Sequence, residues 1–251
     1  MYLVCNSNLL YHASVPLNED GSFKHVNICG KEYWGKNLLD KIDQLIRTAY
    51  FDEDDEEEKR FAMDYIWYLW CGPDAPSFDK DKMATFERYF VADKTLHKET
   101  KGHYYALRNE AEVCDRILEE FGVKPGPHSH IINGHVPVKT IKGEKPIKAD
   151  GKLLVIDGGF SKAYQPETGI AGYTLVYHSH GLQLVQHEPF QSRQKAIEEG
   201  QDIKSTTLVV EFNSQRMMVK DTDKGSELVT QIQDLMKLLV AYRTGLIKEK
   251  Q

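Results

Sequence analysis

Residues 129–163 read SHIINGHVPVKTIKGEKPIKADGKLLVIDGGFSKA, and this stretch decides the fold class of the chain. Its two adjacent isoleucines predict a short buried strand that ends in a tight turn at Gly134, directly before His135. The apolar run 153–156 predicts a second strand, which ends at Asp157. Because α/β sheets assemble ligand sites at the carboxyl ends of their strands, His135 and Asp157 are expected where a sheet presents polar groups to a ligand.

The composition is that of a globular chain. Its 251 residues are 41% hydrophobic and 10% aromatic, enough to form the core of one large domain or two small ones. The net charge of -6 and the lack of a basic run argue against nucleic-acid binding. No apolar segment approaches the roughly 20 residues that span a bilayer, and the start MYLVCNSNLLYH lacks the basic residues of a signal peptide. We therefore expect a cytoplasmic protein that binds neither nucleic acid nor membrane.

Helical periodicity predicts four main helices. They cover residues 37–50, the segment from the acidic run 52–58 to Cys71, residues 109–121 and residues 223–247. Asn37 is the expected N-cap of the first helix, and Asp221 or Asp223 that of the last. The acidic run is expected to be a solvated loop followed by the first turn of the second helix, where carboxylates interact favourably with the helix dipole.

The remaining segments predict strands. Residues 1–15 predict a single strand that ends at Tyr11 and His12. Two hairpins are predicted downstream, one from residues 173–177 and 182–185 and the other from residues 207–212 and 216–219. The order of helices and strands indicates a packed domain of the mixed α/β or α+β class.

Histidines are the main candidates for chemistry in this chain. His12 and His135 each follow an apolar strand, although either one alone is more often a core or loop histidine than a ligand. Two H-x-H pairs are interpreted as loop residues in preference to metal ligands. These pairs are His128 with His130 and His178 with His180.

An ordered set of motifs changes this interpretation. The chain resembles the C-terminal part of class III fructose-1,6-bisphosphatases, metal-dependent sugar phosphatases related to the calcineurin-like metallophosphoesterases. The resemblance is carried by LLYHASVP, LWCGPDAPSFDKDKMATFERYF, HKETKGHYYAL, IINGHVPVKTIKGEKPIKADGKLLVIDGGFSKAYQPETGIAGYTLVYHSHG and DTDKGSELVTQIQDLMKLL. It covers essentially all of residues 1–251 and implies the C-terminal part of a sandwich of two mixed sheets flanked by helices. Residues 37–70 resemble a helical insertion, and residues 223–247 form the C-terminal helix.

The resemblance also implies roles for particular residues. His12 and His135 match the strand-end histidines that ligate one metal of a two-metal site in this superfamily. Arg88 and Lys142 are expected to bind the phosphate groups of the substrate, with a surface ion pair as the alternative for Arg88 and solvation as the alternative for Lys142. Asp157 is expected to orient His135 through a hydrogen bond.

The implied function is the fructose 1,6-bisphosphate phosphatase of gluconeogenesis, which hydrolyses a sugar phosphomonoester with water activated by two divalent metal ions, expected to be manganese. The front-half motifs D-x-H, G-D-x-x-D-R-G and G-N-H-E/D do not occur in the chain. The catalytic residues are therefore unknown, and we expect the chain alone to be inactive until an N-terminal half is supplied in cis or in trans. The alternative is a non-catalytic binding or regulatory half-domain that pairs with a front-half chain.

Three structural expectations follow from this interpretation. The imidazoles of His12 and His135 should converge at one rim of a central sheet. The sheet edge beside them should be exposed, so that the isolated chain forms an oligomer or a monomer that is prone to aggregate. The C-terminal helix should be well packed.

Overall fold

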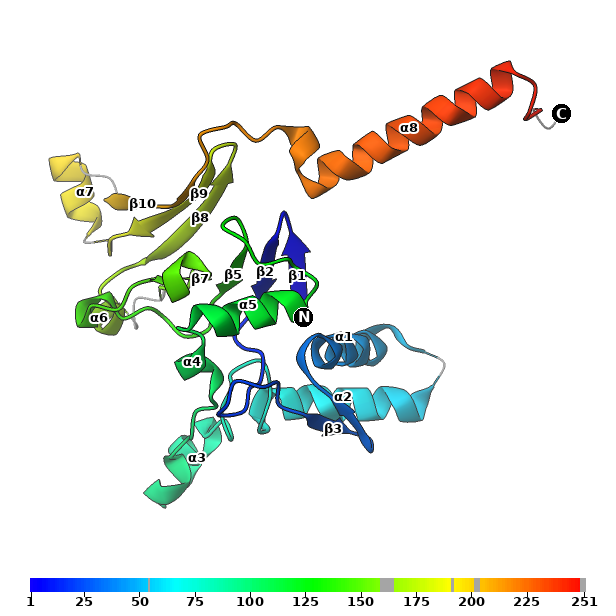
Figure 1. The fold of residues 1–251 in the computed structure, drawn as a ribbon. Helices are drawn as coiled ribbons and strands as arrows, with labels where there is room; N and C mark the ends of the chain where they lie inside the picture. Colours follow the sequence, from blue (N-terminus) through cyan, green and yellow to red (C-terminus); the bar gives the residue numbers. More distant parts are fainter. Residues whose placement is uncertain (54, 159–164, 191, 201–203, 249–251) are drawn as a thin grey trace. The chain divides into compact units, whose positions relative to one another are not determined.

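The structure is a computed structural model that describes residues 1–53, 55–158, 165–190, 192–200 and 204–248 (Figure 1). The chain divides into two compact units. The first consists of Met1–Thr174 and Val185–Thr207, and the second of Leu175–Leu184 and Leu208–Gln251. Several sheets with flanking helices confirm the predicted mixed α/β class.

A five-stranded mixed sheet forms the centre of the first unit, with the strand order β1-β2-β5-β7-β6. The strands are Tyr2–Cys5 (β1), Asn8–Tyr11 (β2), His130–Asn133 (β5), Leu153–Val155 (β7) and Ile147–Lys148 (β6). Strands β2, β5 and β7 are parallel, whereas β1 and β6 are antiparallel to their neighbours. The carboxyl ends of three adjacent strands therefore meet at one edge of the sheet.

The single strand predicted for residues 1–15 is wrong, because this segment forms the hairpin β1-β2. The turn consists of Asn6 and Ser7, whose φ angles are 49° and 62°. Two consecutive residues with positive φ are typical of a type I′ turn, which matches the twist of the strands that it joins. The second strand still ends at Tyr11, directly before His12, as predicted.

Short and long helices complete the first unit (Figure 1). They are α1 (Gly35–Phe51), α2 (Glu56–Cys71), α3 (Thr85–Phe90), η1 (Lys94–His97), α4 (Tyr104–Leu107), α5 (Ala111–Glu120), η2 (Thr140–Lys142), η3 (Ala149–Gly151), α6 (Gln165–Thr168) and α7 (Arg193–Glu199). Helix α5 packs against β5 and carries the buried Val113 and Ile117. This packing buries one face of the central sheet.

Helices α1 and α2 form a separate apolar cluster with the small hairpin of β3 (Val26–Ile28) and β4 (Lys31–Tyr33). Leu38, Ile42 and Leu45 lie at helical spacing on the buried face of α1. The predicted N-cap Asn37 is wrong, since α1 begins one turn earlier after Trp34, which makes no side-chain cap. At the start of α2, the Asp55 side chain accepts hydrogen bonds from the backbone N–H groups of Glu57 and Glu58, so the interpretation of the acidic run is confirmed.

A three-stranded sheet has the order β10-β9-β8. Its strands are Gly172–His178 (β8), Gly181–His187 (β9) and Ser205–Phe212 (β10). The first predicted hairpin is confirmed, since two residues connect β8 to β9. The second is wrong, because residues 216–219 form no strand and Val219 begins the short helix η4 (Val219–Asp221).

Helix α8 (Asp223–Arg243) is the last helix in the described residues of the second unit. Its N-cap is Thr222, whose side chain accepts a hydrogen bond from the Gly225 N–H group, and so neither predicted aspartate is the cap. The prediction that this helix is well packed is also wrong. Gly225 is the only buried residue that α8 contains, because the apolar side chains farther along the helix face outward. Within the described ranges, no helix is both long and apolar enough to cross a membrane.

Candidate metal-binding site

Two histidines meet at the carboxyl edge of the central sheet. His12 directly follows β2, and His135 lies two residues after β5. The Nε2 atom of His12 is 3.1 Å from the Nδ1 atom of His135, and the ring centroids are 5.0 Å apart. The predicted convergence of the two imidazoles is therefore confirmed. Two nitrogens that ligate the same metal ion, each about 2.1 Å from it, lie about 3.0–3.4 Å apart. The distance between the two rings is therefore compatible with chelation of one ion, and it is also compatible with a hydrogen bond between two neutral imidazoles.

The backbone around the pair explains how the rings come together. The Gly134 N–H group donates to the carbonyl of His12 over 2.9 Å, which continues the pairing of β2 with β5 past the strand ends. His135 then adopts a φ of 63°. A bulky residue in the left-handed region is strained, and such strain is concentrated at functional sites. The strained turn holds the His135 ring toward His12.

The surroundings keep His135 neutral. Burial lowers the pKa of His135, and electrostatic interactions with His12 and Lys80 lower it further, whereas Asp157 acts in the opposite direction. A neutral imidazole has a free lone pair at physiological pH, which metal ligation requires. The electrostatics of the site therefore favour ligation over protonation.

Asp157 lies two residues after the third parallel strand, β7, near the pair. Its negative charge acts on His135, and its backbone carbonyl accepts a hydrogen bond from the Val138 N–H group. The predicted hydrogen bond between its carboxylate and His135 stays a prediction. In the part of the chain that the structure describes, no three His, Cys, Asp or Glu side chains are grouped so that they could hold a metal ion. The pair thus supplies two donors of a site that needs more.

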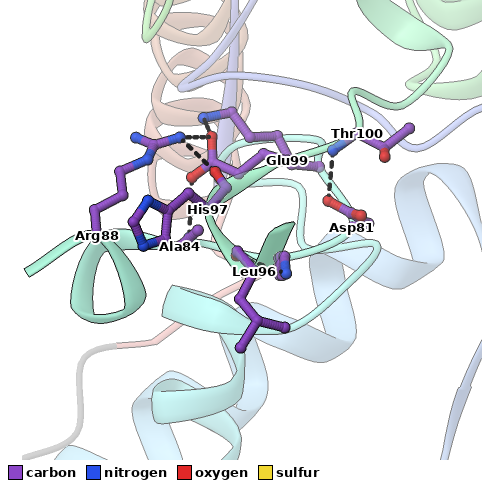
Figure 2. Close-up of polar contacts among 9 residues, drawn as sticks. Asp81, Ala84, Arg88, Leu96, His97, Glu99 and Thr100 are labelled. Atoms are coloured by element: carbon purple, nitrogen blue, oxygen red, sulfur yellow. Dashed lines mark hydrogen bonds and ion pairs between the residues drawn. The ribbon is translucent and has the colours of Figure 1, made fainter. Parts of the chain in front are cut away.

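Arg88 belongs to a charged network centred on Glu99 (Figure 2). The Glu99 carboxylate lies 3.2 Å from Arg88 Nη2 and 2.8 Å from Lys80 Nζ, and it accepts the backbone N–H of Ala84 over 2.9 Å. The Glu99 side chain is only 9% exposed, whereas that of Arg88 is 52% exposed. Arg88 thus forms an ion pair, which was the alternative to phosphate binding. The Arg88 guanidinium still reaches solvent. Binding of phosphate by Arg88 stays a prediction.

Comparison with known proteins places this geometry in a family. The model of the family described as Firmicute fructose-1,6-bisphosphatase matches residues 1–244. The chain belongs to this family. Among the curated fructose-1,6-bisphosphatases of class 3, it is 92% identical to that of Bacteroides fragilis, 82% to that of Bacteroides thetaiotaomicron and 61% to that of Clostridium tetani. The matches cover 99–100% of this chain but only 38% of the length of each of these relatives. No solved structure matches.

The sequence analysis did not single out Lys80. Lys80 pairs with Glu99, as Arg88 does, and its charge also lowers the pKa of His135. It therefore connects the Arg88 network to the histidine pair. The signal was present in the same motif, LWCGPDAPSFDKDKMATFERYF, in which only the arginine was singled out.

Lys142 lies at the end of η2 and is exposed, as the solvation alternative anticipates. Neighbouring Lys148 forms an ion pair with Glu144 over 2.7 Å. The structure therefore shows no feature that selects Lys142 for phosphate binding, and its substrate role stays a prediction.

An open apolar groove lies beside His12. Its volume is about 500 Å³, and its lining includes Leu3, Leu10, Ile132 and Ile156 on one face of the central sheet. Leu3 pairs with Leu10 and Leu10 with Ile132 across neighbouring strands, and Leu3 is 58% exposed. One apolar face of the sheet is thus uncovered beside the histidine pair, whereas β2 and β5 are interior strands that are paired on both sides, so the exposed surface is a face of these strands and not their edge.

Proposed function

We propose that this chain contributes His12 and His135 to a divalent metal site of a fructose-1,6-bisphosphatase, which removes one phosphate from fructose 1,6-bisphosphate in gluconeogenesis. The imidazole pair carries this proposal. The two rings lie 3.1 Å apart at the carboxyl edge of three parallel strands, in a chain whose family is named for this reaction. We place the reaction in the cytoplasm.

A divalent metal, proposed to be manganese, would supply activation of water and neutralisation of phosphate charge when bound. His12 and His135 would hold it through their ring nitrogens, and burial lowers the pKa of the His135 ring. Two neutral imidazoles bring no negative charge, so the site also needs carboxylate ligands. We propose that these come from the part of the enzyme that corresponds to the unmatched length of the relatives, in cis or in trans.

We propose a separate task for Lys80, which acts on His135, and for Arg88, which shares Glu99 with Lys80. Arg88 offers two parallel donors to phosphate oxygens, and Lys80 adds a point charge that acts on His135. Glu99 holds both cations through its largely buried carboxylate. We propose that Arg88 and Lys80 bind a phosphate group of the substrate, and that Asp157 orients His135.

The test is reconstitution. The purified chain should release phosphate from fructose 1,6-bisphosphate at the background rate with Mn²⁺. Turnover should appear after mixing with the portion of the Bacteroides fragilis relative that this chain does not match, or after fusion to that portion if the two do not associate. Robust turnover by the chain alone would contradict the incomplete site.

Variants locate the metal ligands within the reconstituted enzyme. His12→Ala and His135→Asn should each lower turnover by about a hundredfold, the scale of effect that loss of metal-site residues produces. Asparagine is chosen at His135 because it tolerates the left-handed backbone. His25→Ala is the control, since this exposed histidine stacks on Trp34 with no contact to the pair. Wild-type turnover in His12→Ala would refute the proposed role of the pair.

A further inference from the structure

A buried series of hydrogen bonds encloses His12 from both sides. Tyr11 directly precedes His12, and its hydroxyl lies 2.7 Å from the hydroxyl of Tyr104. The Tyr104 hydroxyl accepts a hydrogen bond from Asn133 Nδ2 over 2.7 Å. The same Nδ2 atom donates to the carbonyl of Ala13, directly after His12, over 3.0 Å. The series thus begins one residue before His12 and ends one residue after it.

These bonds join the two strands that carry the histidine pair. Tyr11 is the last residue of β2 and Asn133 the last of β5, two positions before His135. Tyr104 comes from a third element, the short helix α4, and bridges the two strand ends. Its own backbone N–H group donates to the carboxylate of Asp79, which holds α4 in place. Three segments that are far apart in the sequence are therefore linked where the imidazoles meet.

Water does not compete for these bonds, because all four residues that form them are buried. Hydrogen bonds are stronger in such a low-dielectric interior, and linked bonds polarise one another. The orientation of the Asn133 amide is also fixed. Exchange of its oxygen and nitrogen would set two acceptor oxygens, its own Oδ1 and the Ala13 carbonyl, against each other. The amide therefore holds both neighbours in one arrangement.

We propose that Tyr104 and Asn133 are positioning residues for the metal site, which set the separation of the ligating nitrogens of His12 and His135. This role rests on the proposed function, since chelation of one ion is what requires that separation. The two nitrogens lie 3.1 Å apart, within the range of about 3.0–3.4 Å for two ligands of one ion. Groups that orient metal ligands typically contribute about 10–100-fold to metal affinity.

The backbone of His135 gives this role a physical reason. His135 has a φ of 63°, and strain of this kind persists only where the surrounding structure enforces it. Asn133 lies within the same strand end and is tied to the backbone beside His12. Loss of the Tyr104 hydroxyl would free that tie on one side, so the two rings would sample a wider range of separations.

The first test needs no metal. Tyr104→Phe removes the bridging hydroxyl and keeps the ring. In the chain with labelled histidines, NMR should show a weaker nuclear Overhauser effect between the rings of His12 and His135, with an unchanged circular dichroism spectrum. Tyr105→Phe is the matched control, because Tyr105 is the next residue of α4 and its buried hydroxyl has no hydrogen-bond partner. An effect of wild-type strength in Tyr104→Phe would overturn the proposal.

The second test measures metal affinity in the reconstituted enzyme. Tyr104→Phe should raise the Mn²⁺ concentration for half-maximal turnover about tenfold, with an unchanged KM for fructose 1,6-bisphosphate at saturating Mn²⁺. Ser129→Ala is the control for stability, since it removes a buried hydroxyl that bonds to Gly126 at the amino end of β5. It should lower the urea midpoint and leave the Mn²⁺ dependence unchanged. An Mn²⁺ dependence that Tyr104→Phe does not change, or that both variants change equally, would overturn the proposal.

A double variant tests whether the two residues act as one unit. Asn133→Leu removes both amide donors with little change in side-chain shape, and it should raise the required Mn²⁺ concentration at least as much as Tyr104→Phe. The double variant should need no more Mn²⁺ than Asn133→Leu alone, because both changes break the same link. Effects that multiply would show that the residues act separately and would overturn the shared role.

His12→Ala separates failure of this role from failure of the proposed function. If His12→Ala loses turnover while Tyr104→Phe keeps the wild-type Mn²⁺ dependence, the positioning role alone is refuted. If His12→Ala keeps wild-type turnover, the proposed function is refuted and the positioning role with it. The expected result is that His12→Ala loses about a hundredfold in turnover, whereas added Mn²⁺ restores the turnover of Tyr104→Phe.

Discussion

The Nε2 atom of His12 lies 3.1 Å from the Nδ1 atom of His135, although 123 positions separate the two residues in the sequence. The parallel register of β2 and β5 produces this contact. Leu10 pairs with Ile132, and the same register continued by two residues sets His12 beside Gly134. A slip of one residue would turn the flanking side chains to the other face of the sheet. The metal-binding hypothesis therefore depends on the pairing of these two strands.

Asp79 should make the stability of the chain depend on pH. Its side chain is buried, with the residue only 4% exposed, and its Oδ2 atom has no hydrogen-bond partner. Burial raises the pKa of Asp79 from 3.8 to about 6, against the opposing hydrogen bond from the Tyr104 backbone. A raised folded-state pKa means that the folded chain binds more protons than the unfolded chain between these values. Protonation of Asp79 therefore stabilises the folded chain. This contribution is complete below pH 3.8 and is lost as the pH rises through about 6.

Asp79→Asn should remove this dependence, since asparagine keeps the shape without the charge and tolerates the φ of 49°. Urea unfolding should show equal stability near pH 4 and a more stable variant at pH 7.5, by at most about 3 kcal/mol. Asp20→Asn is the control with the opposite sign. Hydrogen bonds from Ser22 lower the pKa of the exposed Asp20, so its loss should weaken the fold at neutral pH. The prediction would be contradicted if the free energy of unfolding changed with pH in the same way for Asp79→Asn and for the wild type.

Gly102→Ala should destabilise the chain by crowding the same carboxylate. A Cβ atom at Gly102 would lie 2.2 Å from Asp79 Oδ1, so the buried side chain or the backbone must move. Such overpacking costs about 1–3 kcal/mol. Gly126→Ala is the matched control, because its Cβ would meet no atom within 4 Å. Equal urea midpoints for the two variants would show that the Asp79 pocket is loosely packed.

Glu99→Gln should weaken the network of Figure 2. The neutral amide cannot balance the charges of Lys80 and Arg88. Its NH₂ group would also replace a carboxylate oxygen, so that one donor faces other donors. We expect a loss of about 1–3 kcal/mol in the free energy of unfolding at pH 7. Glu32→Gln, which breaks an exposed pair with His25, should cost less than about 1 kcal/mol. A smaller effect at Glu99 than at Glu32 would mean that the network does not order this segment.

The sequence was sufficient to locate most elements and the edge where the site lies. Apolar runs that stop at His12, His135 and Asp157 predict three strand ends, and parallel pairing brings these ends together. The contact of Lys80 with Glu99 was not predictable, because it depends on how the loops around α3 and η1 fold back, and no periodicity describes that. No feature of the sequence therefore distinguished Lys80 from the other lysines.

Errors in the predicted elements have local causes. Asn6 and Ser7 interrupt an apolar run that otherwise resembles one strand, so the hairpin turn was overlooked. The apolar residues of α8 recur at helical spacing and predict a buried helix, but spacing alone cannot tell a face that packs within the chain from one that the chain leaves exposed. The periodicity of a helix shows that one of its faces is apolar, but it does not show which surface covers that face.

The most direct measurement of the central claim is Mn²⁺ titration of the chain with its ten histidine side chains isotopically labelled. Paramagnetic Mn²⁺ broadens the NMR signals of the nearest nuclei first. The account predicts that the imidazole signals of His12 and His135 broaden together, at lower Mn²⁺ concentration than those of His178 and His180, and that His12→Ala abolishes the early broadening of His135. Uniform broadening of all histidines, or earlier broadening of His178 and His180, would contradict the assignment of His12 and His135 as metal ligands.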